Sequence, residues 1–414
     1  MGAASVGADR RVEPGAETTV RRGFPSRLAG SSSGDSMSGR TGNGTRVLFL
    51  TQTPEFFGGA ENSLLDLLAN PGVDAVLAAP GEGPLTAAAG ALGVRTRTFA
   101  LGAVERVVRP PRPATLIRAL CDGVRAASQI RWIARDCGAQ VVHSNGLKVH
   151  VLACMARLLG GPPVVVHVRD VPFTAVEKAV WRLLAAIASR LFLVSRACWP
   201  WRRLPGHVRI IHNGIATPTG PLPARPLSWP VTVGFVGRLH PFKGLHLMVD
   251  WLAEARRQGL DLRLIVRGKA RDGEEDYVTA VRATVAARGL EAYCRFEGQC
   301  NGLERVYAGL DIVAVPSSVP DPLPRAVMEA LGLGIPVIGY PAGGIPDMIR
   351  DRETGYLAAT AEEFVAAVRH LTASQADYDR IRAAARRWVS EALTLDALYA
   401  NVNRQYAEIR NSGA

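Results

Sequence analysis

Short apolar runs alternate with longer stretches of helical periodicity along most of the chain. In the first half, the apolar runs predict strands at 46–51, 73–78, 94–99, 141–143, 164–168, 191–194 and 208–211. The stretches between them predict helices at 60–68, between 78 and 94, at 114–135, near 149–159 and at 175–189. This alternation is typical of βαβ units, which form a parallel sheet with helices on both faces.

The pattern stops at residues 216–230 and then begins again. This segment holds five prolines and no periodicity, which predicts a linker between two domains. Beyond it, strands are predicted at 231–236, 262–266, 294–296, 312–315 and 336–339, and the chain after Leu357 is predicted to be helical almost to its end. We therefore expect two doubly wound α/β domains, with a ligand cleft where the carboxyl ends of their strands meet.

Residues 1–45 have a different composition, rich in Gly, Ser, Ala and Arg and without periodicity. Such a segment buries too little apolar area to offset the entropy of ordering it, so we expect a disordered tail, with Met37 as an alternative start. The first domain then covers residues 46–215. Neither a secretory signal nor an apolar run of the roughly 18 residues that span a membrane is recognisable, so a cytoplasmic location is expected.

Composition and charge narrow the class of protein. The 414 residues are 48% hydrophobic and 21% charged, as in ordinary globular proteins. The six cysteines form no C-x-x-C pair, which indicates reduced thiols and no structural metal. A net charge of +12 favours acidic partners, namely phosphorylated substrates, an anionic membrane surface or nucleic acid. No recognisable nucleic-acid-binding module is present.

Common cofactor motifs are missing from the sequence. There is no G-x-G-x-x-G after a predicted strand and no G-x-x-x-x-G-K-[ST], which disfavours NAD binding and P-loop phosphoryl transfer. Gly58-Gly59-Ala60-Glu61, however, follows the first predicted strand and opens a helix. Glycine lets the backbone approach a ligand closely, and a helix N-terminus can bind an anion. A plain tight turn fits this motif equally well.

A second motif covers residues 237–244, directly after the first strand of the second domain. It places Arg238 and Lys243 in one loop at the carboxyl end of that strand. A guanidinium can bind two phosphate oxygens at once, while an ammonium group acts as a point charge. Together they could neutralise a diphosphate and stabilise it as a leaving group. We favour this interpretation over a solvated basic turn.

A third motif runs from Pro320 to Glu329 and leads from a predicted strand into a helix. Pro324 suits the first helical turn, so the N–H groups beyond it could face a phosphate. Asp321 lies in the loop and Glu329 inside the helix, and two such carboxylates could accept hydrogen bonds from sugar hydroxyls. The alternative is that Asp321 caps the helix and Glu329 is a surface charge.

The order of these motifs, with Asn213-Gly214-Ile215, Gly343-Gly344-Ile345-Pro346-Asp347 and Thr354-Gly355-Tyr356-Leu357, resembles family 4 of the retaining glycosyltransferases. The resemblance extends from about Arg46 to the C-terminus. It implies a GT-B fold with a donor domain at 231–385 and a C-terminal helix at 386–414 that returns to the first domain. It also implies a nucleotide-diphosphate-sugar donor, net retention of configuration and no cofactor.

The resemblance further implies roles for individual residues. Arg238 and Lys243 would hold the diphosphate, Glu329 would contact the ribose, and the loop of Gly59 would close over the donor. The implied catalytic residues are Arg238, Lys243 and Asp321; the implied donor-binding residues are Gly59, Arg238, Lys243, Asp321, Leu323, Pro324 and Glu329. Asp321 departs from the family, which usually has Glu there, and the shorter side chain alters the contact with the transferred sugar.

The acceptor side is expected at the strand ends of the first domain. Its candidate residues are His143, Asn145, Lys148, His167 and Asp170. Family members often have a histidine where this chain has Asn145, so no catalytic histidine is transferred, and His143 and His167 fit buried structural roles. The implied mechanism needs neither an enzymic base nor a metal, because the departing diphosphate takes the acceptor proton.

The acceptor itself is predicted to be a glycan, a glycolipid or a small molecule. Eight basic residues lie between Arg169 and Arg209, interleaved with Trp181, Trp199 and Trp201. Such a surface could rest on an anionic membrane leaflet that holds a lipid-linked acceptor, although a solvated basic face fits equally well. Two alternatives to transfer stay open: a catalytically silent nucleotide-sugar-binding protein, and a GT-B epimerase or hydrolase of sugar nucleotides.

Overall fold

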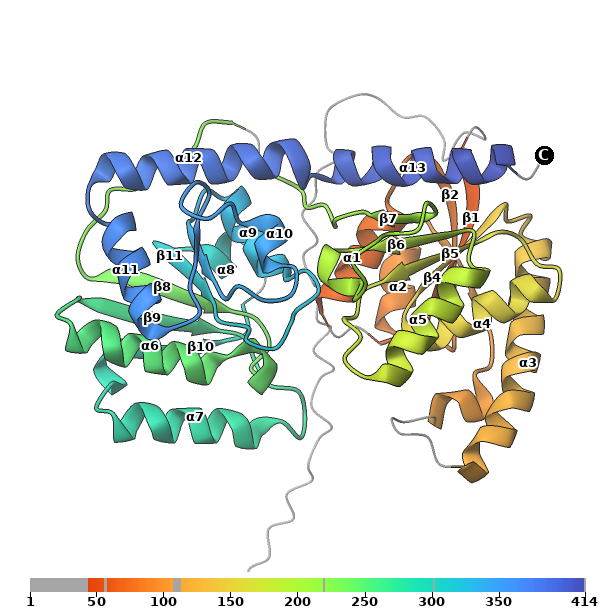
Figure 1. The fold of residues 1–414 in the computed structure, drawn as a ribbon, viewed down its shortest axis with the longest axis horizontal. Coiled ribbons are helices and arrows are strands. Elements are labelled where there is room, and N and C mark those ends of the chain that lie inside the picture. The colour runs from red at the N-terminus through yellow and green to blue at the C-terminus, as the bar shows by residue number, and fades with distance from the viewer. Residues whose placement is uncertain (1–43, 56–57, 107–112, 219, 301, 413–414) are drawn as a thin grey trace, which may run out of the picture.

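The computed structural model describes residues 44–55, 58–106, 113–218, 220–300 and 302–412. The predicted disordered tail therefore lies outside the described residues, apart from Gly44 and Thr45. The described chain forms two α/β units that lie side by side, each built on a parallel sheet (Figure 1). This arrangement confirms the predicted fold class.

The first sheet has seven strands in the described part of the chain, in the order β3-β2-β1-β4-β5-β6-β7, and all of them are parallel. They are β1 (Thr45–Thr51), β2 (Val73–Ala79), β3 (Arg95–Thr98), β4 (Val141–Asn145), β5 (Val164–Val168), β6 (Arg190–Leu193) and β7 (Val208–Ile210). All side chains of β4 and β5 are buried. Burial explains the nearly continuous apolar run of β5, whereas β4 also buries the polar residues His143, Ser144 and Asn145. The edge strand β3 is exposed, and its Arg-Thr-Arg-Thr sequence suits an edge that pairs on one side only.

Helices cover both faces of this sheet. They are α1 (Gly59–Leu68), α2 (Pro84–Ala91), α3 (Pro113–Asp136), α4 (Leu147–Leu158) and α5 (Ala175–Ile187). Leu64 of α1 and Leu85 of α2 share a core with one face of the sheet. Ile130 of α3, Leu152 of α4 and Leu184 of α5 pack on the opposite face. The change of face between α2 and α3 puts the carboxyl ends of β1 and β4 next to each other at the point where the strand order reverses.

The second sheet has six described strands in the order β10-β9-β8-β11-β12-β13, again all parallel. They are β8 (Val231–Val236), β9 (Leu262–Arg267), β10 (Cys294–Gly298), β11 (Ile312–Val315), β12 (Val337–Gly339) and β13 (Tyr356–Leu357). Strand β13 was not predicted, because two residues are too short to produce an apolar run. The later helices are α6 (Leu245–Arg257), α7 (Glu275–Ala287), α8 (Leu303–Tyr307), α9 (Arg325–Gly332), α10 (Ile345–Met348), α11 (Ala361–Leu371), α12 (Gln375–Ala392) and α13 (Leu395–Ser412).

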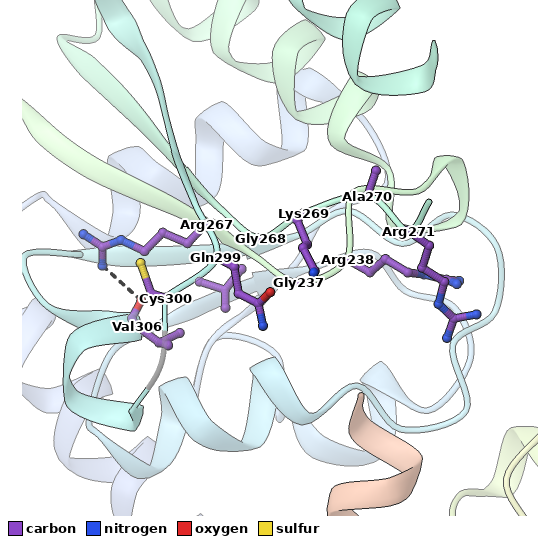
Figure 2. Close-up of a pocket in the computed structure, with 11 residues that line it drawn as sticks. Gly237, Arg238, Arg267, Gly268, Lys269, Ala270, Arg271, Gln299, Cys300 and Val306 are labelled. Atoms are coloured by element: carbon purple, nitrogen blue, oxygen red, sulfur yellow. Dashed lines mark hydrogen bonds between the residues drawn. The ribbon is translucent and has the colours of Figure 1, made fainter. Parts of the chain in front are cut away.

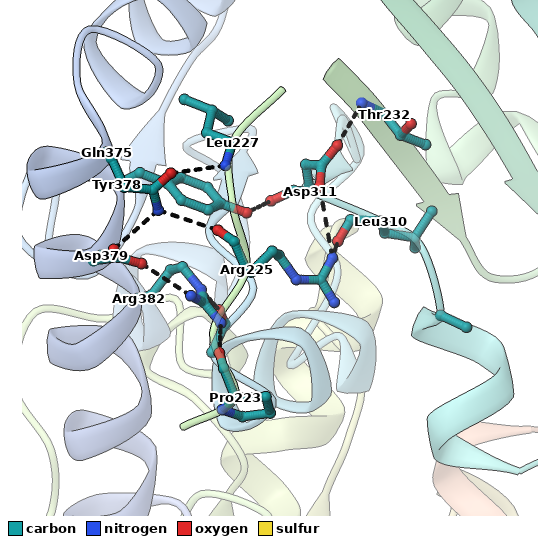
Figure 3. Close-up of polar contacts among 12 residues, drawn as sticks. Pro223, Arg225, Leu227, Thr232, Leu310, Asp311, Gln375, Tyr378, Asp379 and Arg382 are labelled. Carbon is teal, nitrogen blue, oxygen red and sulfur yellow. Dashed lines mark hydrogen bonds and ion pairs between the residues drawn. The ribbon is translucent and has the colours of Figure 1, made fainter. Parts of the chain in front are cut away.

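The proline-rich segment between the sheets is fastened to the second domain through helix α12 (Figure 3). Arg382 donates to the carbonyl oxygens of Gly334 at 3.0 Å and Pro223 at 2.8 Å. Gln375 of the same helix donates to the carbonyl of Arg225 at 3.1 Å and accepts from the amide of Leu227 at 2.7 Å. Three backbone polar groups of this irregular segment, those of Pro223, Arg225 and Leu227, are therefore satisfied by side chains of a regular helix.

The last two helices connect the domains. Helix α12 packs on the second domain, whereas α13 lies along the first (Figure 1). Val402 and Tyr406 of α13 belong to the same core as α1 and α2, and Asn403 exchanges hydrogen bonds with Asn70 at 2.8 and 3.3 Å. The chain crosses between the domains after Ala392, which is later than residue 386, where the returning segment was expected to begin.

Candidate active site

The loop after β8 positions the first predicted cation. It turns through the short 3-10 helix η3 (Pro241–Lys243), in which His240 Nδ1 accepts from the amide of Phe242 at 3.2 Å. Gly244 follows with a φ of 75°, and a Cβ atom there would collide with the carbonyl oxygen of Pro316. Only glycine fits that close approach. The turn thereby brings Lys243 up to the loop after β11, where its Nζ donates to Asp321 Oδ2.

The loop that carries Asp321 is fixed by the diglycine after β12. The amide of Gly344 donates to the carbonyl of Asp321 at 2.8 Å, and Cβ atoms on Gly343 or Gly344 would strike the backbone of Asp321 or Pro322. Gly343 and Gly344 therefore shape the loop of the third motif, which runs from Pro320 to Glu329.

An interdomain pocket of about 190 Å³ lies between the two sheets. It brings together five of the predicted donor-binding residues: Gly59, Lys243, Asp321, Leu323 and Pro324. It is also lined by Ala60, Arg169, Val194, Asn213, Pro322 and Arg325. The N-termini of α1 and α9 both begin at its wall, so unpaired helical N–H groups add to the positive character of the pocket.

A second-domain pocket of about 280 Å³ lies at the strand ends of the second sheet (Figure 2). It contains the side chains of Arg238, Lys269 and Arg271, and its wall includes Gly237, Gly268 and Gln299. Arg238 Nη1 lies 3.6 Å from Glu274 Oε1. Burial lowers the pKa of Arg238, as does the positive charge of Arg271, whereas Glu274 opposes the shift. The same burial lowers the pKa of His240.

The structure places the two predicted diphosphate cations in different pockets. Arg238 lines the second-domain pocket, and Lys243 lines the interdomain pocket. The two pockets are neighbours, since Arg238 and Lys243 belong to the same loop after β8.

Glu329 lines neither pocket in the described chain. Arg325 Nε donates to Glu329 Oε1 at 3.2 Å, and the hydroxyl of Tyr307 donates to Oε2 at 2.9 Å. Arg325 also forms an ion pair with Asp66 of α1 at 2.7 Å, which joins the two domains. Burial raises the pKa of Asp66 despite the opposing charge of Arg325.

The histidines predicted for the acceptor side are buried inside the first domain. His143 Nδ1 lies 2.6 Å from the hydroxyl of Tyr406, and its Nε2 lies 3.1 Å from His167 Nδ1. His150 Nδ1 lies 2.8 Å from the hydroxyl of Ser144. Burial lowers the pKa of all three histidines, that of His150 to about 3. These rings are therefore neutral at neutral pH, and none of them lines either pocket.

The remaining predicted acceptor residues have different surroundings. Asn145 Oδ1 accepts from Arg169 Nε at 2.5 Å, so it contacts a residue that lines the interdomain pocket. Lys148 Nζ donates to the carbonyl of Glu105 at 2.6 Å and lines neither pocket. Asp170 is exposed and also lines neither pocket.

Sequence reasoning assigned no site role to three residues that line the interdomain pocket. They are Arg169, its hydrogen-bond partner Asn213, and Arg325. Arg169 directly follows the fully buried strand β5, and a charged residue at such a strand end was the available signal. Arg169 Nη1 donates to Asn213 Oδ1 at 2.6 Å. Burial lowers the pKa of Arg169 to about 10, against the opposing charge of Asp66, so the guanidinium stays charged at neutral pH.

The predicted basic and aromatic surface between Arg169 and Arg209 does not form as expected. Trp181 and Trp199 are buried in the core, with exposed fractions of 1% and 5%. Arg196 donates to the carbonyl oxygens of Trp199 and Trp201, both at 2.6 Å, so it supports the local backbone. Tryptophans that fill a core cannot insert into a membrane surface.

Two facing parallel sheets, a pocket between their carboxyl edges and a final helix that returns to the first domain define the GT-B class of fold. Solved structures agree over nearly the whole chain. Anabaena HepE, solved in complex with UDP, matches with a TM-score of 0.72 at 20% identity, covering 88% of this chain and 100% of that one. Sucrose-phosphate synthase from Thermosynechococcus elongatus matches with a TM-score of 0.69 at 17% identity, covering 89% of this chain and 100% of that one.

The second domain also resembles known proteins in sequence. Residues 228–388 match the family model described as "Glycosyl transferases group 1", which confirms the predicted resemblance for this domain. Curated relatives include the D-inositol 3-phosphate glycosyltransferases of Mycobacteroides abscessus, 28% identical over 69% of this chain, and of Segniliparus rotundus, 32% identical over 39% of it. The matched parts span 65% and 35% of the lengths of those two relatives.

Proposed function

We propose that this protein is a retaining glycosyltransferase that moves a sugar from a nucleotide-diphosphate-sugar to an acceptor hydroxyl. The observation that carries the proposal is the interdomain pocket, which gathers Gly59, Lys243 and Asp321 from two domains beside a second pocket that contains Arg238. The match of residues 228–388 to group 1 glycosyl transferases supports it. UDP and UDP-glucose, bound in structures of Anabaena HepE, indicate the class of donor.

In the proposed reaction, the bond between the anomeric carbon and a diphosphate oxygen breaks, and a bond to the acceptor oxygen forms on the same face of the sugar. The acceptor proton passes to the departing diphosphate oxygen. Arg238 and Lys243 stabilise the negative charge that grows on the diphosphate, which lowers the barrier only because that charge is larger in the transition state. Protein cations supply this stabilisation, so the transfer is proposed to need no metal.

Asp321 has a clear role in this scheme. In the structure its carboxylate pairs with Lys243 inside the interdomain pocket. A diphosphate that binds Lys243 competes with this carboxylate, and the carboxylate released in this way can accept hydrogen bonds from the hydroxyls of the transferred sugar. Asp321 thus links recognition of the sugar to binding of the diphosphate.

The test is release of nucleotide from a panel of sugar nucleotides that includes UDP-glucose, with and without glycan, glycolipid and sugar-phosphate acceptors. Transfer predicts that nucleoside diphosphate appears together with a glycosylated acceptor whose anomeric configuration is retained, and that excess EDTA changes the rate by less than about twofold. Release without any acceptor would instead identify a hydrolase. Tight binding of UDP without turnover of any donor would identify a catalytically silent protein.

We also propose that the first domain rests on an anionic membrane surface, through a different face from the predicted one. The exposed positions of α5 are Ala175, Val176, Ala179, Arg182, Leu183 and Ala186, which recur at helical spacing. This is an apolar stripe that contains a cation. Val176 is 72% exposed and Leu183 60%, and the adjoining helices expose Leu158 of α4 and Leu120 and Trp132 of α3. Interfacial proteins combine apolar and basic groups in this way.

No described helix is long and apolar enough to cross a bilayer. Cosedimentation with phosphatidylcholine vesicles that contain or lack phosphatidylglycerol tests this proposal. The wild type is expected to bind only the anionic vesicles, and the double variant Val176→Ser, Leu183→Ser to bind them less while keeping its Tm. Equal recovery of both proteins with the vesicles would contradict the proposal.

A further inference from the structure

Arg169 is half-buried at the wall of the interdomain pocket, and one nitrogen atom of its guanidinium, Nη2, is buried without a hydrogen-bond partner among the described residues. The other two guanidinium nitrogens are held by neutral carboxamide oxygens, Nε by Asn145 at 2.5 Å and Nη1 by Asn213 at 2.6 Å. A buried donor without a partner is unfavourable, and a buried charge more so, which calls for an explanation.

Neighbouring carboxylates do not supply that partner. Asp66 is close enough to act on the charge of Arg169, but its carboxylate is bound to Arg325 at 2.7 Å. Glu61 also acts on Arg169 from a distance. The two asparagines therefore fix the direction of the guanidinium without neutralising it. Such an arrangement leaves a full positive charge, held in one orientation, at the wall of a pocket.

The pocket has the other features of an anion site. Arg169 faces it from the first domain, while Lys243 lines it from the second. The helices α1 and α9 begin at its wall, and their unpaired N–H groups favour a negative ligand. Arg169 lies on the acceptor domain, outside the motifs that carry the family resemblance, so its role does not follow from those motifs.

We infer that Arg169 is an anion-binding residue of the reaction site, whose Nη2 donates to a phosphate or other oxyanion of a bound substrate. The inference rests on the proposed function. Two sources offer this chemistry: the diphosphate of the donor, and a phosphate on the acceptor. Asn145 and Asn213 act as positioning residues, because each holds one nitrogen of the guanidinium and leaves the third to the ligand.

The test is calorimetric titration of wild type and Arg169→Met with UDP, UMP and inorganic phosphate. If Arg169 binds the diphosphate of the donor, the variant binds UDP at least about tenfold more weakly and UMP as before. If it binds an acceptor phosphate, the wild type saturated with UDP still binds inorganic phosphate, the variant does not, and UDP binding is unchanged. Arg182→Met, which removes a guanidinium packed over Trp201 outside both pockets, is the matched control.

The Tm of Arg169→Met separates an anion-binding role from a purely structural one. Removing a buried charge that lacks a carboxylate partner is expected to leave Tm unchanged or raise it, because desolvation of the guanidinium no longer opposes folding. A lower Tm together with unaltered binding of UDP and phosphate would overturn the inference. If the wild type itself binds no UDP, the proposed function fails, and the phosphate titration still decides the role of Arg169.

Discussion

The buried polar side chains on β4 and β5 of the first sheet are neutral, whereas the loops after the strands of the second sheet carry charged side chains beside the pockets. In the first sheet, β4 and β5 contain His143 and His167, which are buried, hydrogen-bonded and neutral, and which serve to attach α13 through Tyr406. The loops that follow the strands of the second sheet carry Arg238 and Lys243, each beside a pocket and each paired with a carboxylate. These neutral polar groups support the core of the first domain, whereas the ion pairs of the second domain lie beside the pockets. Arg169 is the charged exception in the first domain, because it lines the interdomain pocket.

Lys243 provides the strongest test of this contrast. Lys243→Ala is expected to lower kcat by more than about tenfold, because it removes charge stabilisation that is greatest in the transition state. Steady-state kinetics with the donor identified by the panel would measure the change, and an unaltered Tm would show that the fold is kept. Lys178→Ala is the control, since Lys178 lies on α5 and lines neither pocket. Full activity in Lys243→Ala would remove Lys243 from the proposed diphosphate site.

The neutral histidines of the first domain predict acid sensitivity. Burial lowers the pKa of His150 to about 3 in the folded protein. Between pH 6.5 and 3, this histidine is therefore protonated in the unfolded chain and neutral in the folded protein. The contribution of this histidine to stability is therefore complete above pH 6.5 and is lost as the pH falls toward 3, by about 1.4 kcal/mol per pH unit. His143 and His167 act in the same direction.

Urea unfolding at pH 7.5 and 5.5 measures this effect. The free energy of unfolding is expected to fall between the two values, and the fall is expected to be smaller in His150→Gln, whose side chain keeps a polar partner for Ser144 but does not titrate. Equal stability of the wild type at both pH values would mean that these histidines are not held neutral by burial.

The predictability of these regions from sequence also differs. The loops of Lys243 and Asp321 are local motifs, in which glycine and proline fix the turn. Five residues of the interdomain pocket could therefore be named from short stretches of sequence: Gly59, Lys243, Asp321, Leu323 and Pro324. The role of Arg169 could not, because its two partners, Asn145 and Asn213, come from other strand ends of the fold. Likewise, Tyr406 is 263 residues from His143, and only the return of α13 brings them together.

Surface properties were harder still to predict. Trp181 and Arg182 are adjacent in sequence, but their positions on α5 turn the first into the core and the second to solvent. Counting charges and tryptophans between 169 and 209 ignores that division. The apolar stripe that α5 does expose consists mainly of Ala, Val and Leu, which in a sequence are indistinguishable from core positions.

The ion pair between Glu274 and Arg238 tests whether a bound anion displaces a carboxylate from its cation, and the expected effect is small. Glu274 lies 3.6 Å from the guanidinium of Arg238 and 3.8 Å from His240, and competes with any anion that enters the second-domain pocket. Because both side chains are partly exposed, the pair is weak, and removing its negative charge is expected to strengthen UDP binding by only about two- to fivefold. Calorimetric titration of Glu274→Gln at low ionic strength measures this gain.

Glu275→Gln is a matched control for that experiment, because Glu275 is the next residue of the chain and is exposed. It changes the net charge by the same amount without lying beside Arg238, so it isolates the local effect from the general increase in positive charge. An equal gain in both variants would show that only net charge matters. Weaker UDP binding in Glu274→Gln would show the opposite of competition: the carboxylate would then hold Arg238 in its binding orientation, and the ion pairs of the second domain would be fixed parts of the site.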